Sequence, residues 1–139
     1  MAGLPALPEL LEEYQLVEAE DRYRLLIDLG RKLEPMPQAL KTDATKVRGC
    51  SASVWVYPTV DEGRLHFLAD SNAAITKGIV ALILLAVQDK PAAEVAGIDI
   101  HEALAPFELG KHLSANRTQG VPNMIALVKE TADRFAAAA

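Results

Sequence analysis

The sequence predicts an α+β fold, in which a small antiparallel sheet of about three strands packs against several helices. Three observations lead to this prediction. β-branched and aromatic residues gather near 53–69 around a turn signal. An apolar run follows directly, and apolar residues recur at helical spacing towards both ends of the chain. The length of 139 residues favours a single domain over 1–139.

The first part of the chain is predicted to be helical. Residues Pro8 to Val17 are expected to form one helix, and Asp21 is expected to cap a second. The segment Glu34-Pro35-Met36-Pro37 should end this second helix, because prolines cannot continue it. Its apolar positions at helical spacing are Tyr23, Leu26, Ile27, Gly30 and Leu33.

A β-hairpin is predicted next. The segments Ser53 to Val60 and Arg64 to Ala69 are rich in strand-forming residues and flank Asp61-Glu62-Gly63. A loop of this length with glycine last is typical of a type I turn followed by a bulge. Thr45 to Arg48 is a candidate for a third strand.

The apolar run after the hairpin predicts a buried helix. Asp70-Ser71-Asn72 offers several N-caps for a helix from about Ala73 to Val87. Its apolar side chains are expected to lie in the core. They are Ile75, Ile79, Val80, Leu82, Ile83 and Val87.

Shorter helices should follow. Pro91 can open one that reaches Ala96. Asp99 and Glu102 have capping-box spacing, which predicts another helix to about Leu109. A final helix should begin near Val121-Pro122. Its apolar face comprises Met124, Ile125, Val128, Ala132 and Phe135.

Composition argues against several classes of function. The net charge of −5 disfavours nucleic-acid binding, which needs a basic surface. One cysteine excludes internal disulfides and zinc sites with several thiolates, and the scattered histidines show no metal-ligand spacing. The N-terminus lacks a secretory signal pattern, and no apolar run is long enough to cross a membrane. We therefore expect a cytoplasmic protein with no membrane partner, no metal and no cofactor.

The single cysteine, Cys50, follows Gly49 at a boundary between predicted elements. If Lys46 to Cys50 is extended, side chains 46, 48 and 50 project to the same side. Two cations would then favour the thiolate over the thiol. Gly49 lets the backbone bend and expose its neighbour. A lone cysteine is also often a small buried hydrophobic residue, and the local sequence leaves both interpretations open.

Several segments resemble those of the SufE-type sulfur acceptors, which include the CsdE proteins. Gly49–Trp55 resembles that family's Gly-Cys-x-x-x-Val-Trp segment, and His112–Gly120 its His-Leu-Ser/Thr-x-x-Arg-x-x-Gly segment. His66–Ile75 and Lys77–Leu82 are similar to its hairpin exit and central helix, and Asp21–Gly30 to its early helix. The resemblance covers nearly the whole chain in order.

The resemblance implies a partner in sulfur transfer. Such proteins bind a pyridoxal-phosphate-dependent cysteine desulfurase of the SufS or CsdA type and stimulate it. They accept its persulfide sulfur and relay it to an iron–sulfur cluster-assembly scaffold. The family's cysteine maps onto Cys50 and its later arginine onto Arg117, which would assist transfer or bind the partner; His112 is a further candidate near the thiol.

The sequence departs from the family pattern at three places. Alanine stands at Ala52 where serine is common, Asn72 where aspartate is common, and Ala115-Asn116 where proline and serine are common. None removes the thiol or the arginine. They leave open which desulfurase is the partner.

The chemistry of a sulfur carrier agrees with these features. Persulfide transfer is a thiolate attack on a sulfur–sulfur bond, and a second thiol nearby would release the sulfur again. A carrier, which is not a stand-alone enzyme, should shelter Cys50 when alone and expose it on docking. The alternative is a regulatory module that activates a desulfurase without carrying sulfur. An iron–sulfur scaffold is disfavoured because one thiolate cannot hold a cluster alone.

The histidines outside these segments are expected to be structural. His66 alternates with Leu65 and Phe67 on a predicted strand, so its side chain should face solvent. His101 belongs to the start of a predicted helix.

Overall fold

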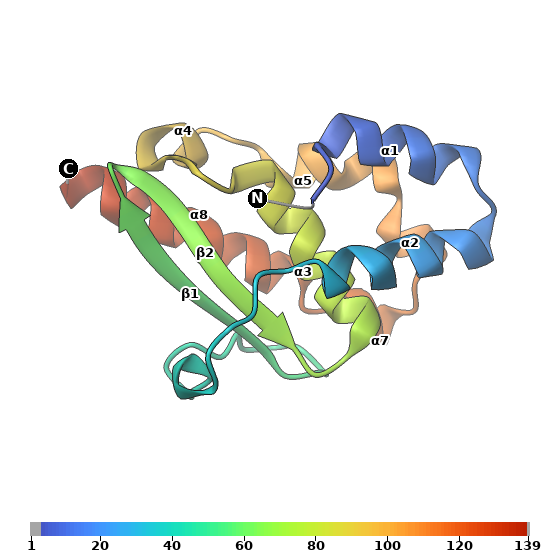
Figure 1. Cartoon of the computed structure of the whole chain (residues 1–139), viewed down its shortest axis with the longest axis horizontal. Coiled ribbons are helices and arrows are strands. Elements are labelled where there is room, and N and C mark those ends of the chain that lie inside the picture. The colour runs from blue at the N-terminus through green and yellow to red at the C-terminus, as the bar shows by residue number, and fades with distance from the viewer. Residues whose placement is uncertain (1–3, 139) are drawn as a thin grey trace.

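The computed structural model describes residues 4–138, apart from the side chains of His112, Asn116 and Arg117. A β-hairpin lies along one side of a group of helices, and helix α3 runs through the centre (Figure 1). In the described part of the chain the sheet has three strands in the order β1-β2-β3. The prediction of an α+β fold is confirmed. No helix among the described residues is both long enough and apolar enough to span a membrane.

The bounds of the elements are as follows. Helices α1 (Leu7–Leu16) and α2 (Ala19–Arg31) precede strands β1 (Val54–Asp61) and β2 (Arg64–Ser71). Helix α3 (Ala74–Val87), strand β3 (Lys90–Pro91), and helices α4 (Ala92–Ala96) and α5 (Ile100–Leu104) come next. Helices α6 (Leu109–His112), α7 (Ala115–Thr118) and α8 (Val121–Ala138) complete the fold, with short 3-10 turns at Gln38–Leu40 and Ala105–Phe107.

The hairpin is present, but its turn differs from the prediction. Asp61 pairs with Arg64, so only Glu62 and Gly63 lie in the loop. Both residues have positive φ, 52° and 77°, as a two-residue type I′ turn requires. The predicted three-residue loop was wrong because Asp61 remains in register with its partner and extends the strand by one residue.

The third strand also differs from the prediction. Lys90 pairs with Leu65 on the free edge of β2. The Gln88 side chain continues this edge, since its amide both donates to and accepts from the backbone of Phe67, at 2.8 and 2.7 Å. Residues 45–48 form only an isolated bridge, between Lys46 and Trp55 on the opposite edge.

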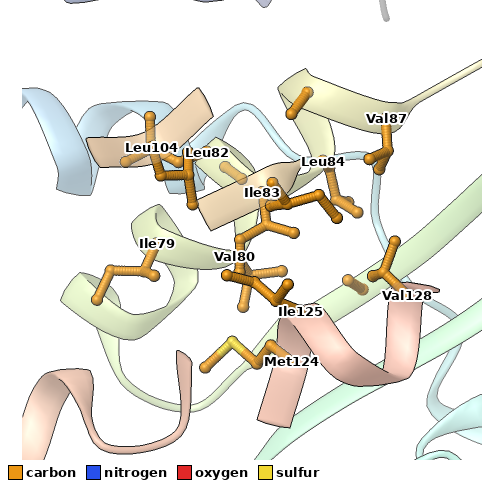
Figure 2. Close-up of a cluster of buried hydrophobic side chains, with 14 of the residues drawn as sticks. Ile79, Val80, Leu82, Ile83, Leu84, Val87, Leu104, Met124, Ile125 and Val128 are labelled. Atoms are coloured by element: carbon orange, nitrogen blue, oxygen red, sulfur yellow. The ribbon is translucent and has the colours of Figure 1, made fainter. Parts of the chain in front are cut away.

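Helix α3 supplies much of the core, as predicted. Side chains from α3 point towards residues of α5 and α8 (Figure 2). Alternate residues of β2, Leu65, Phe67 and Ala69, are buried and complete the packing. The core therefore lies between the inner face of the sheet and the helices.

Helices α2 and α3 approach each other closely at two glycines. A Cβ atom on Gly78 would overlap the backbone carbonyl of Leu26, and one on Gly30 would lie 2.8 Å from the backbone nitrogen of Gly78. Backbone atoms cannot rotate away as a side chain can. Glycine at these positions therefore sets the distance between the two helices.

Two predicted helix caps are wrong. Helix α2 begins at Ala19 with Glu18 as its N-cap, so Asp21 lies inside the first turn. Helix α3 has Ala73 as its N-cap and no side-chain cap; the Ser71 hydroxyl accepts from the Ala73 N–H itself, at 3.3 Å, and the Asn72 side chain bonds to Ser53. The predicted Asp99 cap is confirmed, since its carboxylate accepts from the Glu102 backbone N–H at 3.0 Å. That helix ends earlier than expected, at Leu104.

His66 does not simply face solvent, as the strand pattern suggested. Its Nδ1 lies 2.6 Å from a carboxylate oxygen of Asp89, and its Nε2 lies 2.9 Å from one of Glu34. Carboxylates only accept, so both contacts are hydrogen bonds only when both ring nitrogens carry protons. Burial would lower the pKa of His66, but the two carboxylates outweigh it and raise the pKa above 6.5.

This arrangement predicts a pH-dependent stability. A raised histidine pKa means that the stabilisation is full below the ordinary value of 6.5 and is lost as the pH rises through the folded-state pKa. We expect the free energy of unfolding of the wild type, relative to His66→Gln, to fall over that range. Urea denaturation of both proteins from acidic to mildly alkaline pH measures the difference, and a constant difference would contradict the prediction.

Candidate functional site

Cys50 lies in a loop over residues 48–53 that leads into β1. The loop is closed at its base by backbone pairing, with Val47 N–H donating to Val54 O at 2.8 Å and Val56 N–H donating to Thr45 O at 2.9 Å. The chain therefore enters and leaves the loop at one edge of the sheet. Cys50 is held near the apex of a closed loop instead of lying on a strand.

The first turn of helix α8 holds the start of this loop. Gly49 has φ 82°, a conformation that favours glycine. The Asn123 side-chain amide donates to the Arg48 carbonyl at 2.9 Å. It also lies over Gly49 so closely that a Cβ there would overlap it. The backbone bends at Gly49 as expected, and the bend brings the start of the loop into contact with the Asn123 side chain.

The Cys50 thiol packs against Gly120, the residue just before α8. Its Sγ lies 3.9 Å from the Gly120 carbonyl oxygen, within range of a weak S–H hydrogen bond. A Cβ on Gly120 would overlap the sulfur. The side chain is half-buried and in contact with the hydrophobic core, and this burial raises the pKa of the Cys50 thiol above 9.0. In the free chain, burial thus favours the neutral thiol, and Gly120 partly covers the side chain.

The predicted activation of the thiol by neighbouring cations is wrong. The backbone turns at Arg48 and Gly49, so positions 46, 48 and 50 do not alternate along one strand. Lys46 and Arg48 are exposed. Burial is the cause of the shift in the thiol pKa, and its direction is upward.

The end of the loop is held by the residues after β2. The Ser71 hydroxyl donates to the Ser53 carbonyl at 2.8 Å, and the Asn72 side-chain oxygen accepts from the Ser53 N–H at 3.1 Å. The Asn72 N–H also donates to the Ser53 carbonyl, at 3.2 Å. These groups, predicted as helix caps, instead clamp Ser53.

Asp70 anchors the same end of the hairpin. Its carboxylate pairs with Lys41 at 2.6 Å and with Lys77 at 3.2 Å. Burial would raise the pKa of Asp70, but hydrogen bonds from Lys41, the Ser71 N–H and Lys77 outweigh it and hold the pKa below 3.8. Lys41 also lies over the ring of Trp55, the strand partner of Asp70, and so ties the long connection before β1 to the outer face of the sheet.

The two further candidates, His112 and Arg117, precede Gly120 in the sequence. The backbone of His112 ends α6, and that of Arg117 lies in α7, three residues before Gly120. Both side chains fall outside the described part of the structure. Their positions relative to Cys50 therefore remain a prediction. Among the described residues, no group of three or more His, Cys, Asp or Glu side chains could hold a metal ion.

Sequence reasoning missed the residues that contact the loop. Gly120 appeared only as the last residue of a family-like segment, and Asn123 was absent from the expected site. They lie 70 and 75 residues from their partners, Cys50 and Arg48. A glycine next to Val121-Pro122 at a predicted helix start was the one available signal, and it indicates a close approach without naming the partner.

Comparison with known proteins places the chain in a family. The family model described as "SufE: Fe-S metabolism associated domain" matches residues 8–132, so the chain belongs to the SufE family, which is associated with iron–sulfur metabolism. A SufE-like protein of Rhizobium meliloti, itself described as uncharacterized, is 33% identical over 135 residues, covering 94% of this chain and 96% of that protein.

A solved structure shares the fold. The solution structure of a hypothetical protein from Thermus thermophilus superimposes with a TM-score of 0.75, over 94% of this chain and 96% of that one. Its sequence is 16% identical, so the likeness concerns the fold alone.

Proposed function

We propose that this chain is a sulfur acceptor that receives persulfide sulfur on Cys50 from a pyridoxal-phosphate-dependent cysteine desulfurase. It stimulates the desulfurase and relays the sulfur towards a cluster-assembly scaffold. The observation that carries the proposal is the placement of the single cysteine of a SufE-family chain on a closed loop, with its thiol half-buried against Gly120.

The transfer step exchanges one sulfur–sulfur bond for another. The Cys50 thiolate attacks the terminal sulfur of the donor's cysteine persulfide. A bond forms between Sγ and that sulfur, the donor's sulfur–sulfur bond breaks, and the donor's cysteine leaves as a thiolate that takes up the proton lost by Cys50. No net oxidation or reduction occurs. No second thiol in the chain can attack the loaded persulfide, because Cys50 is the only cysteine.

The raised pKa of the Cys50 thiol means that docking of the desulfurase has to activate the thiol before sulfur transfer. In the free chain burial favours the neutral thiol, which is a poor nucleophile. A docked desulfurase that draws the loop away from Gly120 would remove the cause of the shift and present the sulfur. The sheltered thiol therefore supports a carrier that reacts only with its partner.

Mass spectrometry tests the proposal directly. After incubation with a SufS-type desulfurase and cysteine, the chain should gain the mass of one sulfur atom, and Cys50→Ser should gain none. If stimulation of the desulfurase survives Cys50→Ser while no sulfur is found on the wild type, the chain is a regulatory module and the carrier proposal is wrong.

We also propose that Arg117 assists transfer, by pairing with a partner carboxylate or with the anionic persulfide, and that His112 lies near the loaded thiol. Arg117→Ala should lower the transfer rate about tenfold, in the range of a lost charge-assisted contact, without unfolding the protein. Arg134→Ala, on the distant end of α8, is the matched control. A transfer rate equal to that of the control would exclude a functional role for Arg117.

The cellular context follows from the same chemistry. We infer a cytoplasmic location, because thiols stay reduced there and can be reloaded. We also propose that the whole chain, 1–139, acts as one domain.

A further inference from the structure

Almost every basic side chain in the described part of the structure already has a partner within the chain. Ion pairs along a helix hold Arg24, Arg31 and Lys111. Asp70 pairs with both Lys41 and Lys77. Backbone carbonyls accept from Arg22, Arg64, Lys90 and Lys129, and an aromatic ring lies under Arg134.

Lys46 and Arg48 differ from this set. Both are exposed, and the described residues provide neither with an ion pair or a side-chain hydrogen bond; the same is true of Lys32, at the end of α2. Of these three cations, Arg48 precedes Cys50 by two residues and Lys46 precedes it by four. They line a hollow of about 350 Å³ between the loop and helix α8, and Asn123, Leu127 and one carboxylate, Glu130, line it from α8.

A partner that delivers sulfur to Cys50 docks close to these cations. An extended chain spans at most about 3.6 Å per residue, so Lys46 lies within about 14 Å of Cys50 along the backbone. A standard interface buries about 800 Å² on each partner, which corresponds to a disc of about 16 Å radius. An interface of this size centred on Cys50 therefore extends far enough to include both residues. If the partner buried Lys46 and Arg48 without placing carboxylates opposite them, the unpaired charges would weaken binding.

We propose that Lys46 and Arg48 form a basic docking patch that recognises an acidic surface on the sulfur-donating desulfurase. This inference rests on the proposed function and adds the charge character of the partner's surface. The chain as a whole is acidic, with net charge −5, so two unpaired cations within four residues of Cys50 give this part of the surface a local charge opposite to that of the whole chain.

Binding measured without sulfur transfer tests the patch. In the Cys50→Ser background, the dissociation constant for a SufS-type desulfurase is measured by calorimetry at low and high salt. Lys46→Gln with Arg48→Gln should raise it about tenfold at low salt and flatten its salt dependence. The double variant Lys32→Gln with Arg134→Gln removes the same charge elsewhere and should change the dissociation constant less than twofold.

The outcomes separate this inference from the proposed function. Equal dissociation constants and equal salt dependence for the two double variants would overturn the patch, even if wild-type Cys50 is loaded with sulfur. Weakened binding in the patch variant together with no loading of Cys50 would retain the patch and overturn the carrier. Thermal unfolding of both variants checks folding, which these exposed substitutions should leave nearly unchanged.

Discussion

Replacing Gly78 by alanine is expected to lower the free energy of unfolding by about 2 to 3 kcal/mol, the range for overpacking a closely packed interior. The new Cβ would overlap the Leu26 carbonyl across the contact between α2 and α3. Either the two helices separate, which opens the core, or α3 shifts along its axis. The gain in helix propensity of about 1 kcal/mol only partly offsets this cost.

Urea denaturation measures this change, and Gly110→Ala is its matched control. Gly110 lies in helix α6, and no atom would lie within 4 Å of an added Cβ. Alanine there should leave stability unchanged or slightly higher. Equal unfolding midpoints for Gly78→Ala and the wild type would show that the two helices do not depend on the glycine contact.

Replacing Gly120 by alanine is expected to release the Cys50 thiol in the free protein. Gly120 lacks the positive φ that would itself exclude alanine, so the added methyl group acts through its overlap with Sγ. Displacement towards solvent removes the burial that raises the pKa of the thiol. We expect alkylation by iodoacetamide near neutral pH to accelerate about fivefold, because both exposure and the thiolate fraction increase.

The pH profile of alkylation distinguishes this effect from general loosening. In Gly120→Ala the midpoint of the profile should move down towards the ordinary thiol value, while Gly110→Ala should match the wild type. Asn123→Ala removes the hydrogen bond to the Arg48 carbonyl and should act in the same direction, more weakly. An unchanged midpoint in Gly120→Ala would mean that contact with this residue does not shelter the thiol.

The elements that local sequence predicted well are those with strong periodicity. Helix α3 was predicted from a run of apolar residues, and α8 from one apolar face after a proline. The hairpin was predicted from strand-forming residues around a glycine turn. In the two helices, and at alternate positions of β2, the side chains that identify the element are the ones that become buried, so pattern and packing agree.

The sequence-based predictions were wrong where a side chain could bond either to nearby backbone or to a residue distant in the sequence. Ser71 and Asn72 can cap a helix, but they bond to Ser53 on the cysteine loop. His66 lies at an outward strand position, yet Glu34 and Asp89 contact it from the connections that follow α2 and α3. Short polar side chains have several possible partners, and only the packed fold selects among them.

The sequence by itself determined the fold class and, through its single cysteine and its likeness to the SufE family, which residue to place at the centre of the site. The tertiary structure decided the state of that residue. Sequence spacing suggested an activated thiol beside two cations, whereas the folded chain places Cys50 against Gly120 and leaves Lys46 and Arg48 facing outward. The reason is physical: the pKa of a thiol depends on the atoms that surround it, and Gly120, which covers the Cys50 sulfur, lies 70 positions away in the sequence.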